Sequence, residues 1–256
     1  MILAALVATG FAVAGIHAFL LLRNPGSRFH RTAFRLGAGL GCIAIPLQLF
    51  SGDISARAVA KLQPAKLAAM EAHYHTRTHA PFVILGIPNS ETQLTPFGLE
   101  VPGALSLLLG HRTDTEVAGL DRVPREHWPN VKLVHWSFDL MVGCGMLMAL
   151  LALWTGWALW RRRRLPESRS LIRAYVIATP LGFLAIETGW MVTELGRQPW
   201  VVQGFMRTRD AVTTMPYLGV PFYTITALYV LLAIVVIALM RRQFLETARR
   251  SPSSPG

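Results

Sequence analysis

Residues 193–200 read TELGRQPW and close an apolar run, Ala174 to Val192, that is long enough to cross a lipid bilayer. Gly196 can end a helix by adopting a left-handed conformation, and Pro199 prevents the helix from resuming. An arginine and a tryptophan follow, and tryptophan is typical of membrane–water interfaces. Taken alone, the stretch predicts a polar site at a membrane face, with a solvated helix cap at Glu194 as the alternative.

The composition predicts a polytopic α-helical membrane protein. Of the 256 residues, 52% are hydrophobic and 15% are charged, the mean hydropathy is +0.40, and the apolar residues form long blocks. The net charge of +11 does not indicate a nucleic-acid partner, because the basic residues sit in short clusters beside the apolar blocks. Cys42 and Cys144 lie inside apolar blocks, which argues against a disulfide framework or a zinc site.

Five apolar blocks are expected to span the membrane as an all-α helix bundle. No basic region precedes the first block and no small-residue cleavage site follows it, so it is not interpreted as a signal peptide. Glycines 37, 39 and 41 in the second block predict close helix packing. The predicted spans are residues 1–22, 33–50, 133–160, 171–194 and 222–240.

One long polar connection, residues 52–131, separates the second and third spans within what we expect to be a single membrane domain, residues 1–256. It contains an amphipathic helix candidate at residues 64–75, many prolines, and no strong strand pattern. A connection of this length in a compact protein is more often functional than idle. The tail, residues 250–256, is rich in serine and proline and is expected to be disordered.

Three arginine clusters predict the orientation of the chain. They lie at residues 23–35, at residues 161–173 and at residues 241–250, and five spans place all three on one side. Positive residues concentrate on the cytoplasmic side, so the long connection and residues 197–200 are expected on the extracytoplasmic side of a bacterial cytoplasmic membrane. Met1 then starts outside the membrane on an apolar helix, and we expect the chain to be the later part of something longer.

Two charged residues in the long connection are candidates for binding a small polar headgroup. Lys66 and Glu71 are five residues apart, so on a helix they diverge by more than the spacing of neighbours. The pattern alone favours a solvated amphipathic face. The functional alternative is a hydrogen-bond donor and an acceptor offered at the membrane surface.

The third span carries residues with two interpretations. Met141 is either core filling or a haem ligand, and Gly143 and Gly145 would leave room for a flat macrocycle. Asp139 is costly near a membrane unless it is partnered or at the rim, so it invites a functional explanation. In the fourth span, Glu187 and Glu194 are seven residues apart and share a helix face, which indicates a cofactor or a proton route.

The histidines are weaker candidates for ligands. A cluster in the long connection has metal-like spacings but no cysteine or acidic frame, so a solvated and silent cluster is the favoured interpretation. His17 and His135 are better placed for haem, although packing or interfacial roles are favoured for both. The clustered histidines are His73, His75 and His79.

Taken together, these segments resemble subunit I of the cytochrome bd family of quinol oxidases, with the short form of its quinol-oxidising loop. The resemblance rests on the order and spacing of several motifs rather than on any one of them. They are Gly52-Asp53, QPAKLAAME (63–71), PFGLEVPG (96–103), MVG (141–143), Gly189-Trp190 and ELGRQPW (194–200).

The resemblance implies a quinol:oxygen oxidoreductase of aerobic respiration. Lys66 and Glu71 match the family's quinol-site residues, Met141 its methionine ligand of low-spin haem b, and Glu194 its glutamate ligand of high-spin haem b. Arg197 would neutralise a haem propionate or support Glu194. The implied cofactors are low-spin and high-spin haem b with haem d or a further haem b, and the implied substrate is ubiquinol or menaquinol.

The match covers only the second part of the family's subunit. The family's histidine ligands and its proton-route glutamates belong to helices upstream of Met1, so an upstream segment or a separate chain would supply them, beside oxidase subunit II and membrane lipid as partners. A basic residue stands two positions before the MVG motif in well-known members, whereas this chain has Asp139. The alternative function is a remodelled, non-catalytic membrane paralogue that binds haem partially or serves in assembly.

Overall fold

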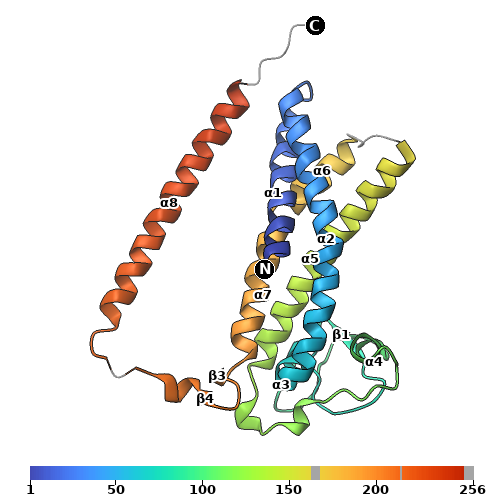
Figure 1. Cartoon of the computed structure of the whole chain (residues 1–256), viewed down its shortest axis with the longest axis vertical. Coiled ribbons are helices and arrows are strands. Elements are labelled where there is room, and N and C mark those ends of the chain that lie inside the picture. The colour runs from blue at the N-terminus through green and yellow to red at the C-terminus, as the bar shows by residue number, and fades with distance from the viewer. Residues whose placement is uncertain (163–167, 214, 251–256) are drawn as a thin grey trace.

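The computed structural model describes residues 1–162, 168–213 and 215–250, and these form a bundle of long helices with a folded cap at one end (Figure 1). Within these described ranges, five helical segments are long and apolar enough to cross a membrane, which confirms the predicted all-α polytopic fold. The spans are formed by α1 (Ile2–Arg23), α2 (Arg28–Leu62), α5 (Val131–Arg162), α6 (Arg169–Ala178) with α7 (Leu181–Gly196), and α8 (Gly219–Arg250). The predicted disordered tail lies beyond the described residues, apart from residue 250 at the end of α8.

Glycines allow α1 and α2 to pack closely, as the second span predicts. A Cβ on Gly37 would lie 2.7 Å from the backbone nitrogen of Ala14, and one on Gly10 would lie 2.5 Å from that of Gly41. Gly39 differs, because a Cβ there would meet nothing within 4 Å. Close approach therefore depends on one glycine face of α2.

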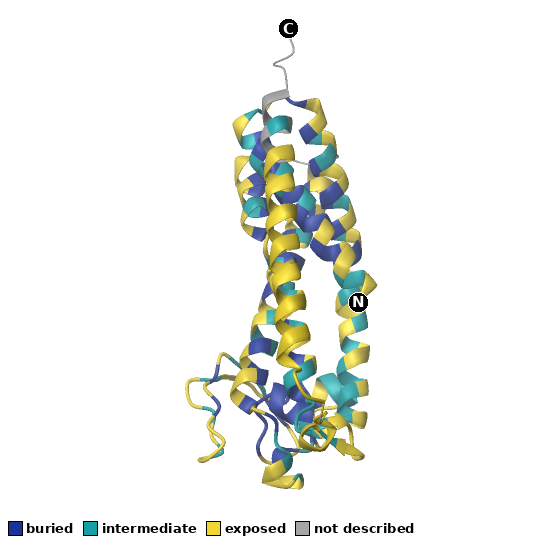
Figure 2. Cartoon of the chain, turned by 90° about the vertical axis from the view of Figure 1, so that its left-hand side faces the viewer, coloured by how far each residue is buried: buried dark blue, intermediate teal, exposed yellow. Residues whose placement is uncertain are grey.

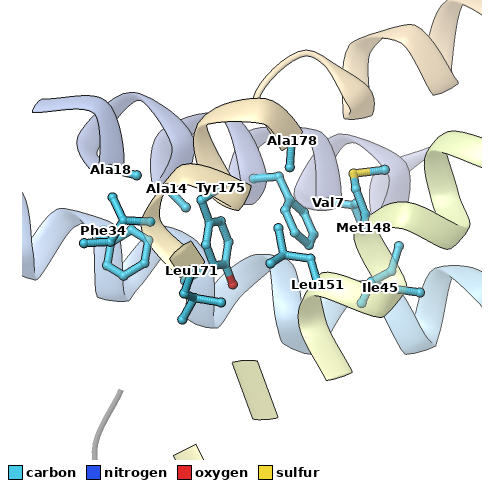
Figure 3. Close-up of a cluster of buried hydrophobic side chains, with 14 of the residues drawn as sticks. Val7, Ala14, Ala18, Phe34, Ile45, Met148, Leu151, Leu171, Tyr175 and Ala178 are labelled. Carbon is cyan, nitrogen blue, oxygen red and sulfur yellow. The ribbon is translucent and has the colours of Figure 1, made fainter. Parts of the chain in front are cut away.

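Tyr175 of α6 lies within the apolar core of the bundle (Figure 3). Its ring is fully buried and meets the ring of Phe34 edge-on at 5.1 Å between centroids. Its hydroxyl lies 2.9 Å from Thr155 Oγ1 of α5 and 3.4 Å from Cys42 Sγ of α2. One side chain thus connects three helices through both packing and polar contacts.

The fourth span is broken, where one continuous helix was expected. α6 ends at Ala178 and α7 begins at Leu181, with Thr179 and Pro180 between them. Proline has no backbone N–H to continue the ladder and clashes with the preceding turn, so the apolar run bends there. The predicted left-handed conformation of Gly196 is also wrong, because the positive-φ glycines of the described chain are Gly103 and Gly204.

The second helix runs further than predicted. α2 continues past the expected end at residue 50 to Leu62, so residues 52–62 are helix rather than loop. An ion pair between Asp53 and Arg57, one turn apart, lies on this extension. Pro64 then starts the short helix α3 (Pro64–Met70), which is shorter than the predicted 64–75.

The remainder of the long connection folds into a cap with its own small cores. It contains a pair of short antiparallel strands, β1 (Phe82–Ile84) and β2 (Leu99–Val101), which the sequence pattern did not indicate. Helix α4 (Ala104–Gly110) and the turns η1 (Leu120–Arg122) and η2 (Arg125–His127) follow. After α7 come β3 (Trp200–Val202), β4 (Met206–Arg207) and η3 (Thr208–Ala211).

The two ends of the bundle differ in character. The turn between α1 and α2, the end of α5 and the start of α6, and the end of α8 lie at one end, and the cap lies at the other (Figure 1). The described arginines of the three clusters therefore share the end opposite the cap. Helix α8 stands apart, and its apolar span is 0% buried, as its uniformly exposed colour in Figure 2 shows.

Candidate functional site

Helix α3 brings the two charged candidates of the connection into the protein interior. Its apolar residues pack against α5 and α7 in the core cluster that contains Ala68, Ala69 and Met70. Lys66 is only 9% exposed and Glu71 only 2%. A solvated amphipathic face is therefore the wrong description of this segment.

Lys66 lies against the end of α7. A Cβ on Gly196 would be 2.9 Å from Lys66 Cγ, so the glycine makes room for the lysine stem. Burial lowers the pKa of Lys66, the nearby Arg197 lowers it further, and Glu194 opposes the shift. The Lys66 ammonium is thus a neighbour of the TELGRQPW stretch that closes the fourth span.

Glu71 is a buried carboxyl with an unmet hydrogen-bonding capacity. It follows the last residue of α3, and its Oε2 atom has no partner within the described part of the chain. Burial raises the pKa of Glu71 well above its usual value, and the charge of Asp139 raises it further. A carboxyl in this state is suited to exchanging a proton with a bound ligand.

Beside Glu71, α5 contributes His135 and Asp139, which lie one turn apart. His135 is fully buried, and its Nδ1 is 2.7 Å from the carbonyl oxygen of Met70. Its Nε2 lies 3.5 Å from Asp139 Oδ2, which accepts a 2.7 Å hydrogen bond from the backbone N–H of Leu85. The acidic residue in the membrane helix is therefore partnered.

Met141 lies two residues after Asp139 on α5 and faces α7. A Cβ on Gly189 would be 2.9 Å from Met141 Sδ, so this glycine leaves room for the thioether. A Cβ on Gly145, one turn after Met141 on the same side of α5, would meet nothing within 4 Å, and neither would one on Gly143, so α5 is unobstructed there in this chain. A soft thioether with an unobstructed glycine one turn away fits the donor chemistry of a haem site.

Glu194 forms an ion pair with Arg197 at the end of α7. Both side chains are about 41% exposed in this chain, and the Nε atom of Arg197 is buried without a partner among the described residues. Glu187, which was expected to share a face with Glu194, is exposed. The partly exposed Glu194 carboxylate fits the donor chemistry of a haem ligand, and the Arg197 guanidinium fits a partner of that carboxylate or of a haem propionate.

Comparisons with known proteins identify the lineage of this arrangement. The family described as cytochrome bd terminal oxidase subunit I matches residues 1–248. The chain belongs to this family. The predicted resemblance is therefore confirmed, and with it the assignment of the chain as a multi-pass membrane protein.

Among cytochrome bd relatives, the chain is 35% identical over 252 residues to the "Putative cytochrome bd menaquinol oxidase subunit I" of Bacillus subtilis (strain 168). It is 27% identical over 321 residues to the "Cytochrome bd-II ubiquinol oxidase subunit 1" of Escherichia coli (strain K12). These matches cover 95% and 99% of this chain, but 56% and 62% of the two relatives. The chain thus spans little more than half the length of the curated relatives that it matches.

A solved bd oxidase shares the fold. The structure of the bd oxidase from Geobacillus thermodenitrificans superposes with a TM-score of 0.80 at 32% identity. The match covers 98% of this chain and 56% of that chain. The helix order seen here is therefore that of a bd subunit I over the matched part.

The histidines of this bd subunit do not gather into a metal site. No group of three or more potential metal ligands occurs within the described ranges. In the cap, His73 Nε2 lies 3.3 Å from the carbonyl oxygen of Val117, whereas His75 and His79 are exposed. His17 Nδ1 lies 3.0 Å from His30 Nδ1, at the end opposite the cap.

The sequence indicated Lys66, Glu71, Met141 and Glu194 as site residues of this bd subunit, but it did not predict which other residues they contact. The structure brings Lys66 to the end of α7 near Glu194 and Arg197, and Glu71 to α5 near Asp139. It also brings His135 to the carbonyl group of the residue before Glu71. The position of His135 at the entry of a span was the one sequence signal for that contact.

Proposed function

We propose that this chain forms the quinol-oxidising and haem-binding part of a cytochrome bd-type terminal oxidase, in which quinol oxidation is coupled to the reduction of oxygen to water. The observation that carries the proposal is the buried Glu71 carboxyl, whose Oε2 lacks a partner among the described residues. An ionisable group so placed is costly unless a ligand or a proton meets it. Family membership and the names of the relatives support the same reaction.

Glu71 and Lys66 have different roles in the proposed quinol site, one as a hydrogen-bond and proton acceptor and the other as a hydrogen-bond donor. Glu71 accepts a hydrogen bond from a quinol hydroxyl and then takes the proton of that hydroxyl, and its raised pKa brings its proton affinity toward that of a working general base. Lys66 donates a hydrogen bond to the headgroup from the α7 side, where burial lowers its pKa. Ubiquinol and menaquinol both present the hydroxyl groups that this pair would bind.

Met141 and Glu194 would hold haem iron, on low-spin and high-spin haem b respectively. The haems supply electron transfer and oxygen reduction when bound, with haem d or a further haem b at the oxygen site. Met141 offers a soft donor from α5, one turn before the unobstructed Gly145. Arg197 holds the Glu194 carboxylate and is placed to neutralise a propionate.

The remaining parts of the enzyme would come from outside the segment of subunit I that this chain matches. Oxidase subunit II and further helices, in the same or a separate polypeptide, would cover the exposed apolar faces, of which α8 is the largest. Lipid would cover what those partners leave. With the described arginines at one end, the cap would face the extracytoplasmic side of a bacterial cytoplasmic membrane, and the proton of Glu71 would leave there.

The test is the quinol turnover of the assembled oxidase carrying Glu71→Gln. We expect turnover to fall at least tenfold while haem content stays near that of the wild type, because Glu71 binds quinol rather than iron. Glu91→Gln is the matched control, since Glu91 is an exposed glutamate of the same connection. Wild-type turnover in Glu71→Gln would reject the proposed quinol site. If the assembled wild-type complex has no quinol turnover, the alternative of a non-catalytic paralogue holds.

A further inference from the structure

The tautomer of His135 follows from its contacts. Its Nδ1 lies 2.7 Å from the Met70 carbonyl oxygen, and a carbonyl oxygen can only accept. Nδ1 must therefore carry the hydrogen, and the neutral imidazole then presents a bare lone pair at Nε2. That Nε2 atom is buried and makes no hydrogen bond within the described part of the chain.

What faces Nε2 is another acceptor. Asp139 Oδ2 lies 3.5 Å away and is itself held by the Leu85 N–H, so the carboxylate is fixed in that position. Glu71 Oε2, a neighbour of the same Asp139, is also buried without a partner. Once Glu71 is ionised, these buried acceptors have no donor between them, which is costly, and a hydrogen brought in by a ligand removes the conflict.

We infer that His135 Nε2 and Glu71 Oε2 form an acceptor pair that binds a hydroxyl group of the reduced quinol headgroup. This inference rests on the proposed function and adds His135 to the quinol site. It also predicts that this end of the site binds the reduced quinol in preference to the oxidised quinone. When Glu71 is ionised, a quinol offers hydroxyl hydrogens to the pair, whereas the oxidised quinone offers carbonyl oxygens, which the same acceptors repel.

The alternative for His135 is a purely structural role, in which it docks α5 onto α3 through Nδ1. Two variants separate the roles. In His135→Asn the side-chain amide can still donate to the Met70 carbonyl, but no atom reaches the position of Nε2. In His135→Gln the amide oxygen can take the position of Nε2, while the donor at Nδ1 is lost.

The experiment measures equilibrium binding of two redox-inert probes to the assembled oxidase. One probe is an alkylated 1-naphthol, which has a single hydroxyl donor, and the other is its O-methyl ether, which has none. In the wild type we expect the naphthol to bind roughly tenfold more tightly than the ether, the worth of one buried hydrogen bond. In His135→Asn we expect this preference to fall to about two- or threefold, and His135→Gln should retain more of it.

Two further measurements make each outcome decisive. Glu71→Leu removes the acceptor oxygens of the other member of the pair without touching the bond between His135 and Met70, and it should lower the preference as well. His75→Asn changes an exposed histidine of the cap and should leave the preference unchanged. Haem spectra and thermal midpoints of each variant report whether the complex has assembled.

The inference is overturned if His135→Asn keeps the full preference, or if the preference survives in Glu71→Leu. A preference that depends on Glu71 but not on His135 would leave the proposed function standing and return His135 to a docking role. Equal binding of both probes by the wild type, with normal turnover in Glu71→Gln, would instead reject the proposed quinol site itself.

Discussion

The backbone N–H of Leu85 donates a 2.7 Å hydrogen bond to the carboxylate of Asp139, and this bond ties the cap to the membrane helix α5. Leu85 has a positive φ of 57°, an unusual conformation for a branched side chain that needs support from its surroundings. The indole Nε1 of Trp136 adds a 3.0 Å bond to the Gly86 carbonyl oxygen. The acidic residue before the MVG motif therefore has a structural use as a loop anchor.

Removing this anchor should loosen the cap. In Asp139→Ala, the Leu85 N–H loses its charged acceptor, at a cost of about 1–2 kcal/mol to the local structure. We expect chymotrypsin to cut near the exposed Leu94 and Phe97 roughly tenfold faster, because cleavage follows the population of the open form. Asp139→Asn keeps a carbonyl oxygen for Leu85 and is the control. Equal rates in Asp139→Ala and the wild type would show that the bond does not hold the cap.

The raised pKa of Glu71 should make the protein less stable as pH rises. Above the ordinary value of 4.5, the unfolded chain releases the Glu71 proton while the folded chain retains it, so the folded state binds more protons. Stability then declines with pH from about 4.5 up to the raised pKa. Glu71→Gln has no proton to lose, so its gain in thermal midpoint over the wild type should be larger at pH 8 than at pH 5.

The matched control for this pH effect is again Glu91→Gln, whose side chain is exposed. Midpoints of the detergent-solubilised complex, followed by loss of soluble haem protein, provide the measurement. A gain that is the same at both pH values would mean that the native carboxyl titrates as it does in the unfolded chain.

The orientation of the bundle can be tested with single cysteines. Ser90 is exposed in the cap and Ser170 is exposed at the start of α6, at the opposite end. After replacement of the native Cys42 and Cys144, we expect an impermeant maleimide added outside intact cells to label Ser90→Cys and not Ser170→Cys. The reverse labelling pattern would invert the proposed topology.

The membrane spans were predictable because apolar blocks of about twenty residues carry their own signal. The same criterion missed the extension of α2, since residues 51–62 mix apolar residues with three charged ones, and their helix signals are the alanines and the Asp53–Arg57 pair rather than hydropathy. It also passed over the break at Thr179 and Pro180, because hydropathy does not register a lost hydrogen bond. Strands of three residues, such as β1, are too short to show an alternation.

The site was only partly predictable, for a different reason. The local pattern around Lys66 and Glu71 favoured a solvated face, and only the family resemblance marked them as functional. Their burial comes from α3 packing against α5 and α7, a tertiary contact that no local pattern records. For the same reason the sequence could place His135 at a span entry but could not show that it meets Met70.

Gly189 of α7 should control the position of Met141. In Gly189→Ala the new Cβ would lie 2.9 Å from Met141 Sδ, closer than packed atoms tolerate, so the thioether must shift. If Met141 binds low-spin haem, we expect altered absorption of that haem although the ligand itself is unchanged. Gly156→Ala, on α5 with nothing within 4 Å of its Cβ, is the control and should have a wild-type spectrum.

Substitution of the two proposed iron ligands should affect different haems. Met141→Ala removes a soft thioether, a ligand type that raises the reduction potential, so the low-spin haem should become high-spin or shift to a lower potential. Glu194→Ala removes an anionic ligand, which favours ferric iron, so the high-spin haem should be disturbed instead. Loss of Glu194 would also leave the Arg197 guanidinium without its carboxylate.

Optical and redox titrations of the assembled oxidase distinguish the two effects, because each variant should leave the other haem's band in place. Met141→Leu serves as a matched variant, since it keeps the apolar volume and loses only the sulfur donor. If Met141→Leu and Met141→Ala alter the low-spin band alike, the sulfur rather than the packing is responsible. Unchanged haem bands in all three variants would show that Met141 and Glu194 are packing and surface residues, and that this chain keeps the family fold without these ligands.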